Sequence, residues 1–184
     1  LQQYLIEFPG GRYQALGIAW DSRPEAEGGQ RWFHLYPDER ITPNDALHWT
    51  GREQNWNYQC AECHSTNVRK NFDLPSKSYA TTWSEIDVSC EACHGPGAEH
   101  LAWAGGQIGE DSGLAVSLAD PHPAVWEFDE ETGIAARDQP RTSWAQSETC
   151  ARCHARRSLI EERHRFGRQL LDNQVPALLE ASLY

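Results

Sequence analysis

Three short stretches of this chain place two cysteines and a histidine in one fixed pattern, C-x-x-C-H. They read CAECH, CEACH and CARCH, and together they use all six cysteines of the 184 residues. The residues concerned are Cys60, Cys63 and His64; Cys90, Cys93 and His94; and Cys150, Cys153 and His154. Two thiols at this spacing can add across the two vinyl groups of one porphyrin, and the adjacent imidazole can ligate its iron. The pattern therefore predicts three covalently attached haem c groups, each bound by two cysteines and one proximal histidine.

Other uses of paired cysteines fit this sequence less well. Two C-x-x-C pairs can form a four-cysteine zinc site, but three pairs leave one over, and the zinc interpretation ignores the histidines. A thioredoxin-like motif needs a βαβ context that the sequence does not show. Disulfides within C-x-x-C are usually redox-active rather than structural. A histidine after the second cysteine of every pair favours haem attachment.

The chain contains no methionine, so His/Met ligation of an iron within this chain is impossible. Five histidines remain after the three proximal ones, which is enough for bis-histidine ligation of all three irons. They are His34, His48, His100, His122 and His164. His122 lies between two prolines in an exposed type of loop, and His164 lies in the charged run EERHRFGR, which is typical of a solvated helix face. These two are the weaker candidates.

The stronger candidates for distal ligands are His100, His48 and His34. His100 follows the Gly-Pro-Gly turn of HGPGAEH, and we expect it to point away from its own haem and towards another. His48 comes twelve residues before Cys60, in a loop long enough to fold over a haem. His34 belongs to the strand-like segment QRWFHLYP. An iron without a distal histidine would be open to a small molecule, and the protein would then be an enzyme rather than an electron carrier.

Composition agrees with a core built on cofactors. Apolar residues make up 39% of the chain, while Trp and His each occur eight times. Three haems would give about 61 residues per haem, from 184/3, so we expect porphyrins to form much of the interior. The net charge of −11 argues against nucleic-acid binding and against anionic lipid. The sequence contains no run of 18 or more apolar residues, so it predicts no membrane span, and no signal peptide is visible.

The order of elements predicts an N-terminal sheet followed by short helices. A hairpin is expected from residues 3–8 and 12–20 around FPGGR, with a third strand at 31–36. Short extended pieces are expected at 68–73 and 77–83, and helices at 84–94, 98–104 and from Ser143 to about Arg163. Residues 105–140 look irregular. The expected fold class is a multihaem cytochrome c, mainly α and irregular with a small N-terminal β-hairpin region, in one trihaem domain spanning residues 1–184.

The runs WNYQCAECHSTNVRKNFD, YATTWSEIDVSCEACHGPGAEHLAWA and CARCHARRSLI resemble a family of bacterial multihaem c-type cytochromes that is often fused to tetratricopeptide repeats. They are also distantly similar to the hydroxylamine oxidoreductase and multihaem nitrite reductase superfamily. The resemblance implies that His100 ligates a neighbouring haem and that the HLYP and HW segments supply His34 and His48 as ligands. It also implies a portion of a larger cytochrome.

We therefore expect an electron carrier with three bis-histidine haems rather than an enzyme. The alternative is a reductase or oxidase of small nitrogen or sulfur compounds at an open iron. The expected partners are redox proteins, further haem domains or further copies of this chain. Haem attachment in bacteria occurs outside the cytoplasmic membrane, which predicts a periplasmic or extracellular location.

Overall fold

The computed structural model describes residues 1–107, 109, 111–163 and 166–180. The chain divides into two compact units, unit 1 (Leu1–Asp87) and unit 2 (Val88–Tyr184). The first C-x-x-C-H motif belongs to unit 1, and the second and third belong to unit 2. A single trihaem domain over residues 1–184 stays a prediction, because a division into compact units does not decide whether they fold independently.

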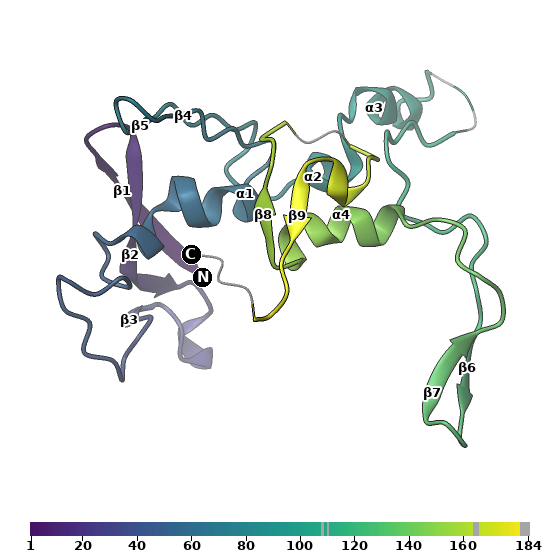
Figure 1. Cartoon of the computed structure of the whole chain (residues 1–184), viewed down its shortest axis with the longest axis horizontal. Coiled ribbons are helices and arrows are strands. Elements are labelled where there is room, and N and C mark those ends of the chain that lie inside the picture. The colour runs from purple at the N-terminus through teal and green to yellow at the C-terminus, as the bar shows by residue number, and fades with distance from the viewer. Residues whose placement is uncertain (108, 110, 164–165, 181–184) are drawn as a thin grey trace. The chain divides into compact units, whose positions relative to one another are not determined.

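Unit 1 begins with a three-stranded antiparallel sheet in the order β1-β2-β3 (Figure 1). Its strands are β1 (Gln2–Phe8), β2 (Arg12–Asp21) and β3 (Arg31–His34), and a short 3-10 helix, η1 (Glu25–Glu27), precedes β3. The FPGGR turn joins the first two strands, so the predicted hairpin and third strand are confirmed.

The chain then approaches the first motif through three consecutive helical turns. These are the 3-10 helix η2 (Arg52–Gln54), the π-helix η3 (Trp56–Cys60) and α1 (Ala61–His64). The Asn55 side chain accepts a hydrogen bond from the Tyr58 backbone N–H at 2.9 Å and so caps the π-helical turn. Trp56 is buried, and its ring meets those of Tyr13 and Trp83 edge-on at 5.9 and 5.2 Å.

A buried glutamine on β2 connects this helical segment to the preceding loop. Gln14 is 2% exposed. Its amide Nε2 donates to the backbone carbonyls of Trp49 and Gly51, both at 2.9 Å, and its Oε1 accepts from the Asn55 side chain at 3.0 Å. Since buried polar groups are costly without partners, one side chain fixes the His48 loop and the start of the motif helix against the sheet.

The region expected to form a helix over residues 84–94 is helical only at its end. Residues 84–89 are not helical, and Glu85 forms an isolated antiparallel bridge with Thr66. The side-chain hydroxyls of Ser65 and Thr66 donate to the backbone carbonyls of Ile86 and Asp87, both at 2.8 Å. These tertiary hydrogen bonds override the local helix preference. The predicted extended pieces nearby contain β4 (Phe72–Asp73) and β5 (Ser78–Tyr79), which pair with each other.

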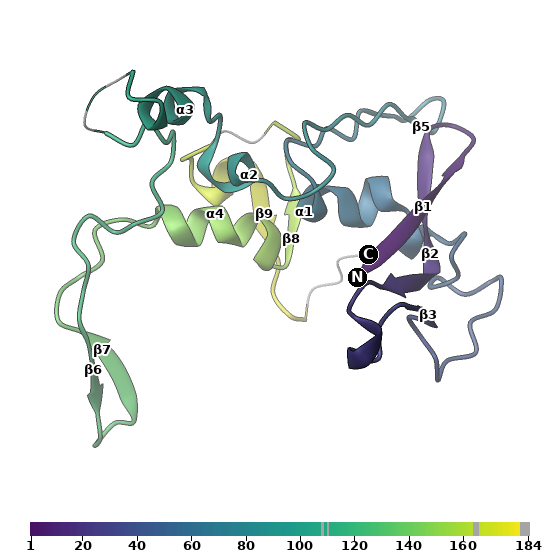
Figure 2. The ribbon, with the colours of Figure 1, turned by 180° about the vertical axis from the view of Figure 1, so that it is seen from behind.

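Unit 2 consists of short helices with two small hairpin-like sheets (Figure 2). Its elements are α2 (Cys90–His94), α3 (Ala98–Ala104), β6 (Trp126–Asp129), β7 (Ile134–Arg137), α4 (Ala145–His154), β8 (Arg157–Leu159), η4 (Leu170–Asp172) and β9 (Gln174–Pro176). The helix predicted at 98–104 is confirmed by α3. The helix predicted from Ser143 to about Arg163 ends at His154, because the chain continues into β8, which pairs with β9. Residues 105–140, expected to be irregular, contain the β6–β7 hairpin.

The prediction of a mainly α and irregular fold is wrong. Helical residues make up 23% and strand residues 25% of the described structure, and the strands form several small sheets. The α-helices are short, from four to ten residues. Each motif helix ends at the motif histidine, His64, His94 or His154. Segments that flank the second and third motifs instead pair with other parts of the chain, Glu85 with Thr66 and β8 with β9. None of the helices in the described part of the chain combines the length and hydrophobicity needed to cross a bilayer.

The stability of unit 1 should depend on Gln14. Replacing it in Gln14→Leu keeps the approximate volume but leaves two carbonyls and the Asn55 amide without their partner, so we expect the free energy of unfolding to fall by about 2–4 kcal/mol. Gln2→Leu makes the same chemical change at an exposed strand position and should stay within about 0.5 kcal/mol of the wild type. Chemical denaturation of both variants measures the difference, and equal stabilities would contradict this role.

Candidate haem-attachment sites

The first motif begins where the π-helix ends. Cys60 is the last residue of η3, and Cys63 and His64 follow on α1. Burial raises the pKa of the Cys60 thiol, and the neighbouring Cys63 raises it further. Glu62, between the two cysteines, forms an ion pair with Lys70 at 3.5 Å. The imidazole of His64 is exposed at the end of the helix, where the chain turns into an extended conformation at Ser65.

The second motif is a single helical turn, α2, with a Gly-Pro-Gly turn directly after it. Glu91, between the two cysteines, accepts a hydrogen bond from the Gly97 backbone N–H at 2.8 Å and so fixes this turn. Gly95 has φ +75°, and a Cβ there would lie 3.1 Å from both Ala115 and Phe166, so only glycine fits without a shift. His94 is thereby placed beside the segment that contains Val116.

Hydrogen bonding fixes the tautomer of His94. Its Nδ1 lies 2.9 Å from the backbone carbonyl oxygen of Val116. A carbonyl can only accept, so Nδ1 carries the proton and Nε2 keeps its lone pair. A histidine that donates through one ring nitrogen to a backbone carbonyl and offers the other is the usual arrangement for metal ligation. The proximal role predicted for His94 therefore fits its surroundings.

The third motif occupies the last turns of α4. Cys150 and Cys153 are exposed, and His154 ends the helix. Arg152, between the cysteines, donates from Nη1 to the Ala92 carbonyl oxygen of the second motif at 2.9 Å. The second and third motifs are thus in direct contact within unit 2, and Figures 1 and 2 both show α2 beside α4. Porphyrins attached to these two helices would be near neighbours.

His100 is presented by α3 with the same tautomer as His94. Its Nδ1 lies 2.7 Å from the Ser112 carbonyl oxygen, and its ring stacks on Trp103 at 5.4 Å between centroids. Gly113 (φ +65°) makes this approach possible, because a Cβ there would lie 2.7 Å from the Glu99 backbone. Nδ1 therefore donates and Nε2 retains its lone pair. The arrangement supports the prediction that His100 is a distal iron ligand.

His34 and His48 line one cavity in unit 1. Its volume is about 300 Å³. The other lining residues are mostly apolar: Leu16, Gly17, Ile18, Ile41, Leu47 and Trp49. A cavity with apolar walls and a few polar groups is the usual form of a small-molecule or cofactor site. The structure thus brings two of the sequence-predicted ligands together, although they lie fourteen positions apart in the chain.

The two histidines of this cavity differ in their hydrogen bonds. The Nδ1 atom of His34 accepts from the Tyr36 backbone N–H at 3.0 Å, so a neutral His34 carries its proton on Nε2. Ligation through Nε2 would require a tautomer change and loss of that bond. The Nδ1 atom of His48 lies 2.8 Å from the Thr50 hydroxyl, which can accept or donate, and it also accepts from the Thr50 backbone N–H at 3.4 Å. Ligation through Nε2 would therefore cost each histidine a backbone hydrogen bond at Nδ1, and the bond to His48 is the longer and weaker one.

The remaining two histidines provide little evidence about iron ligation. His122 is exposed in the loop before β6, and its backbone N–H donates to Asp120 at 3.1 Å. His164 lies outside the described residues. The weaker standing of His122 as a ligand stays a prediction.

The attachment residues fit haem c in three respects. All six cysteines are thiols rather than disulfides, and each C-x-x-C-H lies on a helical turn. The chain exposes 13,074 Å², whereas two separate globular units sharing its mass of 20.9 kDa would expose about 10,800 Å². The chain alone therefore exposes about 2,300 Å² more than two such units would, and attached porphyrins could cover part of this excess.

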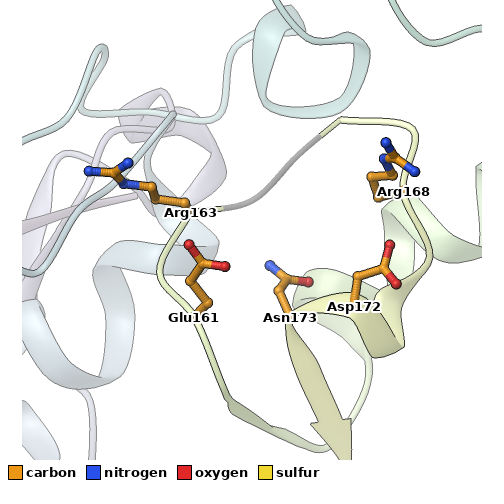
Figure 3. A pocket seen from close by; sticks show the side chains of 5 residues that line it. All are labelled: Glu161, Arg163, Arg168, Asp172 and Asn173. Atoms are coloured by element: carbon orange, nitrogen blue, oxygen red, sulfur yellow. The ribbon is translucent and has the colours of Figure 1, made fainter.

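A larger cavity in unit 2 has a different character. It measures about 360 Å³. Figure 3 shows its lining, which is entirely polar or charged: Glu161, Arg163, Arg168, Asp172 and Asn173. Among the described lining residues two acids balance two arginines, and none of these side chains is apolar. Among the described residues, no group of three or more His, Cys, Asp or Glu side chains gathers as a metal site.

Sequence reasoning missed the residues that position the motifs. Gln14 and Arg152 contact backbone groups far from them in the chain, and Glu91 contacts the Gly97 backbone six residues on. Glutamine, glutamate and arginine are ordinary surface residue types. The position of Glu91 and Arg152 between paired cysteines was the available hint, because a side chain there must lie beside the attachment site.

Comparison with known proteins identifies one family. A family model described as cytochrome c554 and c-prime matches residues 30–95, about a third of the chain. The matched region includes the first two motifs together with His34 and His48, and it stops before His100 and the third motif. No curated protein and no solved structure matches the chain. The match supports a c-type cytochrome, with covalently bound haem and electron transport.

The role of His100 can be tested by His100→Ala. Removing a distal imidazole leaves an iron with an open position, so we expect part of the low-spin absorption and electron paramagnetic resonance signal of the haem-loaded protein to become high-spin. Added imidazole should restore the low-spin form. His122→Ala removes an exposed histidine of the same unit and should leave the spectra unchanged. A fully low-spin His100→Ala spectrum would exclude ligation by this residue.

Proposed function

We propose that this chain is an electron-transfer cytochrome that carries three covalently attached haems, one at each C-x-x-C-H motif. The observation that carries the proposal is that all three motifs lie on helical turns with their cysteines as thiols. The family match supports the cytochrome class independently of the structure. When bound, haem c supplies one-electron Fe(III)/Fe(II) chemistry.

The residues of the chain hold and arrange these sites. In each motif the two cysteine thiols would form thioether bonds with the two vinyl groups of one porphyrin. His64, His94 and His154 would be the proximal iron ligands. The hydrogen bond from His94 to the Val116 carbonyl orients the imidazole and raises its basicity, which favours the ferric state. The Arg152 contact with Ala92 keeps the second and third sites close, as rapid electron exchange requires.

Distal histidine ligation completes the proposal. His100 presents an imidazole whose hydrogen bond to the Ser112 carbonyl leaves Nε2 free to ligate, whereas His48 and His34 could join it after a tautomer change. Bis-histidine coordination would close the irons to small molecules and suit them to electron transfer rather than catalysis. The resemblance to multihaem cytochromes supports the same interpretation. The more distant resemblance to hydroxylamine oxidoreductase and multihaem nitrite reductase supports the alternative, since that superfamily includes enzymes with an open haem.

The partners of such a protein are redox proteins, which a cytochrome implies. Further haem domains or further copies of the chain are candidates, since the resemblance points to larger multihaem assemblies. We also propose a periplasmic or extracellular location, because bacterial c-type haems are attached on that side of the cytoplasmic membrane.

Haem counting tests the number of sites. We expect native mass spectrometry to give the mass of the polypeptide plus three haems, and the pyridine haemochrome assay to give three haems per chain. The double variant Cys150→Ser/Cys153→Ser should retain two, because serine forms no thioether. Ser147→Ala, on the same helix, should retain three. Unchanged haem content in the double variant would contradict attachment at the third motif.

Ligand binding separates an electron carrier from an enzyme. With all irons bis-histidine ligated, cyanide and nitric oxide should leave the absorption spectrum of the haem-loaded protein unchanged at neutral pH. A high-spin fraction that binds nitrite or hydroxylamine would instead support the alternative, a reductase or oxidase of small nitrogen compounds.

A further inference from the structure

A third cavity lies in unit 2 at the beginning of α4, the helix that ends with the third motif. Its volume is about 180 Å³, which is below the range of about 300–1,000 Å³ that is typical for drug-sized ligands. Its lining residues are Leu118, Asp120, Ala124, Trp126, Arg137, Arg141, Ser143 and Gln146. The space is suited to a small ion or to one arm of a larger group.

The charges around this cavity favour an anion. Two arginines face one acid, whereas the acids and arginines of the cavity in Figure 3 are balanced. The acid, Asp120, already accepts hydrogen bonds from the Thr142 hydroxyl at 2.6 Å, the His122 N–H at 3.1 Å and Arg137 Nη2 at 3.2 Å. The bond from Thr142 holds the pKa of this carboxyl well below its usual range. Its charge is thus largely satisfied without the second nitrogen of Arg137.

The most specific evidence for a bound anion is the second guanidinium nitrogen of Arg137. Nη1 of Arg137 is buried and has no hydrogen-bond partner within the described part of the chain. The guanidinium carbon lies 5.9 Å from the ring centroid of Trp126, and the side chain is 14% exposed. A buried guanidinium N–H without a partner is expensive, and an anionic oxygen is the group that satisfies it best.

The start of α4 adds a second favourable element. Gln146 is in the first turn of this ten-residue helix, whose N-cap residue, Trp144, makes no side-chain capping hydrogen bond. The Ser143 hydroxyl accepts from the Ala145 N–H at 3.3 Å, and the other first-turn N–H groups attract anions through the helix dipole. Arg141 lies nearby, with its guanidinium 5.2 Å from the Trp144 ring centroid.

We propose that this cavity binds a carboxylate or similar oxyanion between Arg137, Arg141 and the first turn of α4. Two sources share that chemistry: a propionate arm of the haem attached four residues further along the helix, at Cys150, and a small free anion from solution. The propionate source rests on the proposed function, whereas the anion site itself does not.

The experiment uses the haem-loaded full chain in chloride-free buffer. Sodium acetate and sodium phosphate are titrated by isothermal calorimetry, and midpoint potentials are measured spectroelectrochemically. If the site takes a free anion, wild-type protein binds acetate or phosphate, and Arg137→Gln weakens binding at least about tenfold, because a charged hydrogen bond is lost. If a propionate occupies the site, neither salt binds. In that case Arg137→Gln lowers the midpoint potential of one haem, because a nearby positive charge no longer disfavours the ferric iron.

Controls keep either result interpretable. Lys77→Gln removes one positive charge from an exposed turn of unit 1 and should change neither measurement. Arg137→Lys should restore part of the anion binding or of the midpoint potential because it keeps the charge.

A second variant keeps the proposal testable if Arg137→Gln fails to fold. Gln146→Glu places a competing carboxylate on an exposed first-turn position that tolerates acids, and it should reduce anion binding or lower the potential in the same way. Wild type that binds neither salt, with all variants at the wild-type potential, would overturn the proposal. Without attached haem, the acetate titration still tests the cavity.

Discussion

The scarcity of buried apolar side chains is the constraint on which this structure depends. In the described part of the chain the buried apolar residues are Ala15, Ala19, Trp56, Ala61, Val116 and Leu170. Three of the six are alanines, which contribute little burial each. Meanwhile large residues such as Leu101, Phe128 and Ile160 stay exposed. A polypeptide with so small an aliphatic interior needs another apolar body to pack against, and covalent porphyrins would supply it.

Local order in the chain comes instead from polar contacts. Gln14 is buried on β2 and satisfied at both ends of its amide. Asn57 is likewise fully buried, where it accepts from the Tyr13 N–H at 2.7 Å and donates to Thr81. Such hydrogen bonds add little net energy individually, but a wrong arrangement would strand buried groups, so they specify one geometry. The first motif is therefore positioned chiefly by buried hydrogen bonds rather than by hydrophobic packing.

The sequence predicted the parts of the fold whose determinants are local. The FPGGR turn between two alternating runs identifies the first hairpin, and the Gly-Pro-Gly turn identifies the start of α3. It failed where distant groups decide. No local feature of residues 84–89 indicates that the hydroxyls of Ser65 and Thr66 donate hydrogen bonds to backbone carbonyls in this segment. Nor does the charged run after His154 reveal that β8 pairs with β9, fifteen residues further on. The motif residues can be predicted from the sequence because covalent haem attachment requires that spacing, whereas the partners of each histidine depend on tertiary structure.

The two spacer residues inside each motif have a consequence for how the three sites are told apart. Every spacer combines one alanine with one charged residue, and the charged residue differs in its contact: Glu62 with Lys70, Glu91 with Gly97, and Arg152 with Ala92. The cysteines and the histidine are the same in all three motifs, whereas the charged spacer side chain makes a different contact in each. Exchanging spacers between motifs would remove these contacts and leave the residues predicted to attach haem unchanged.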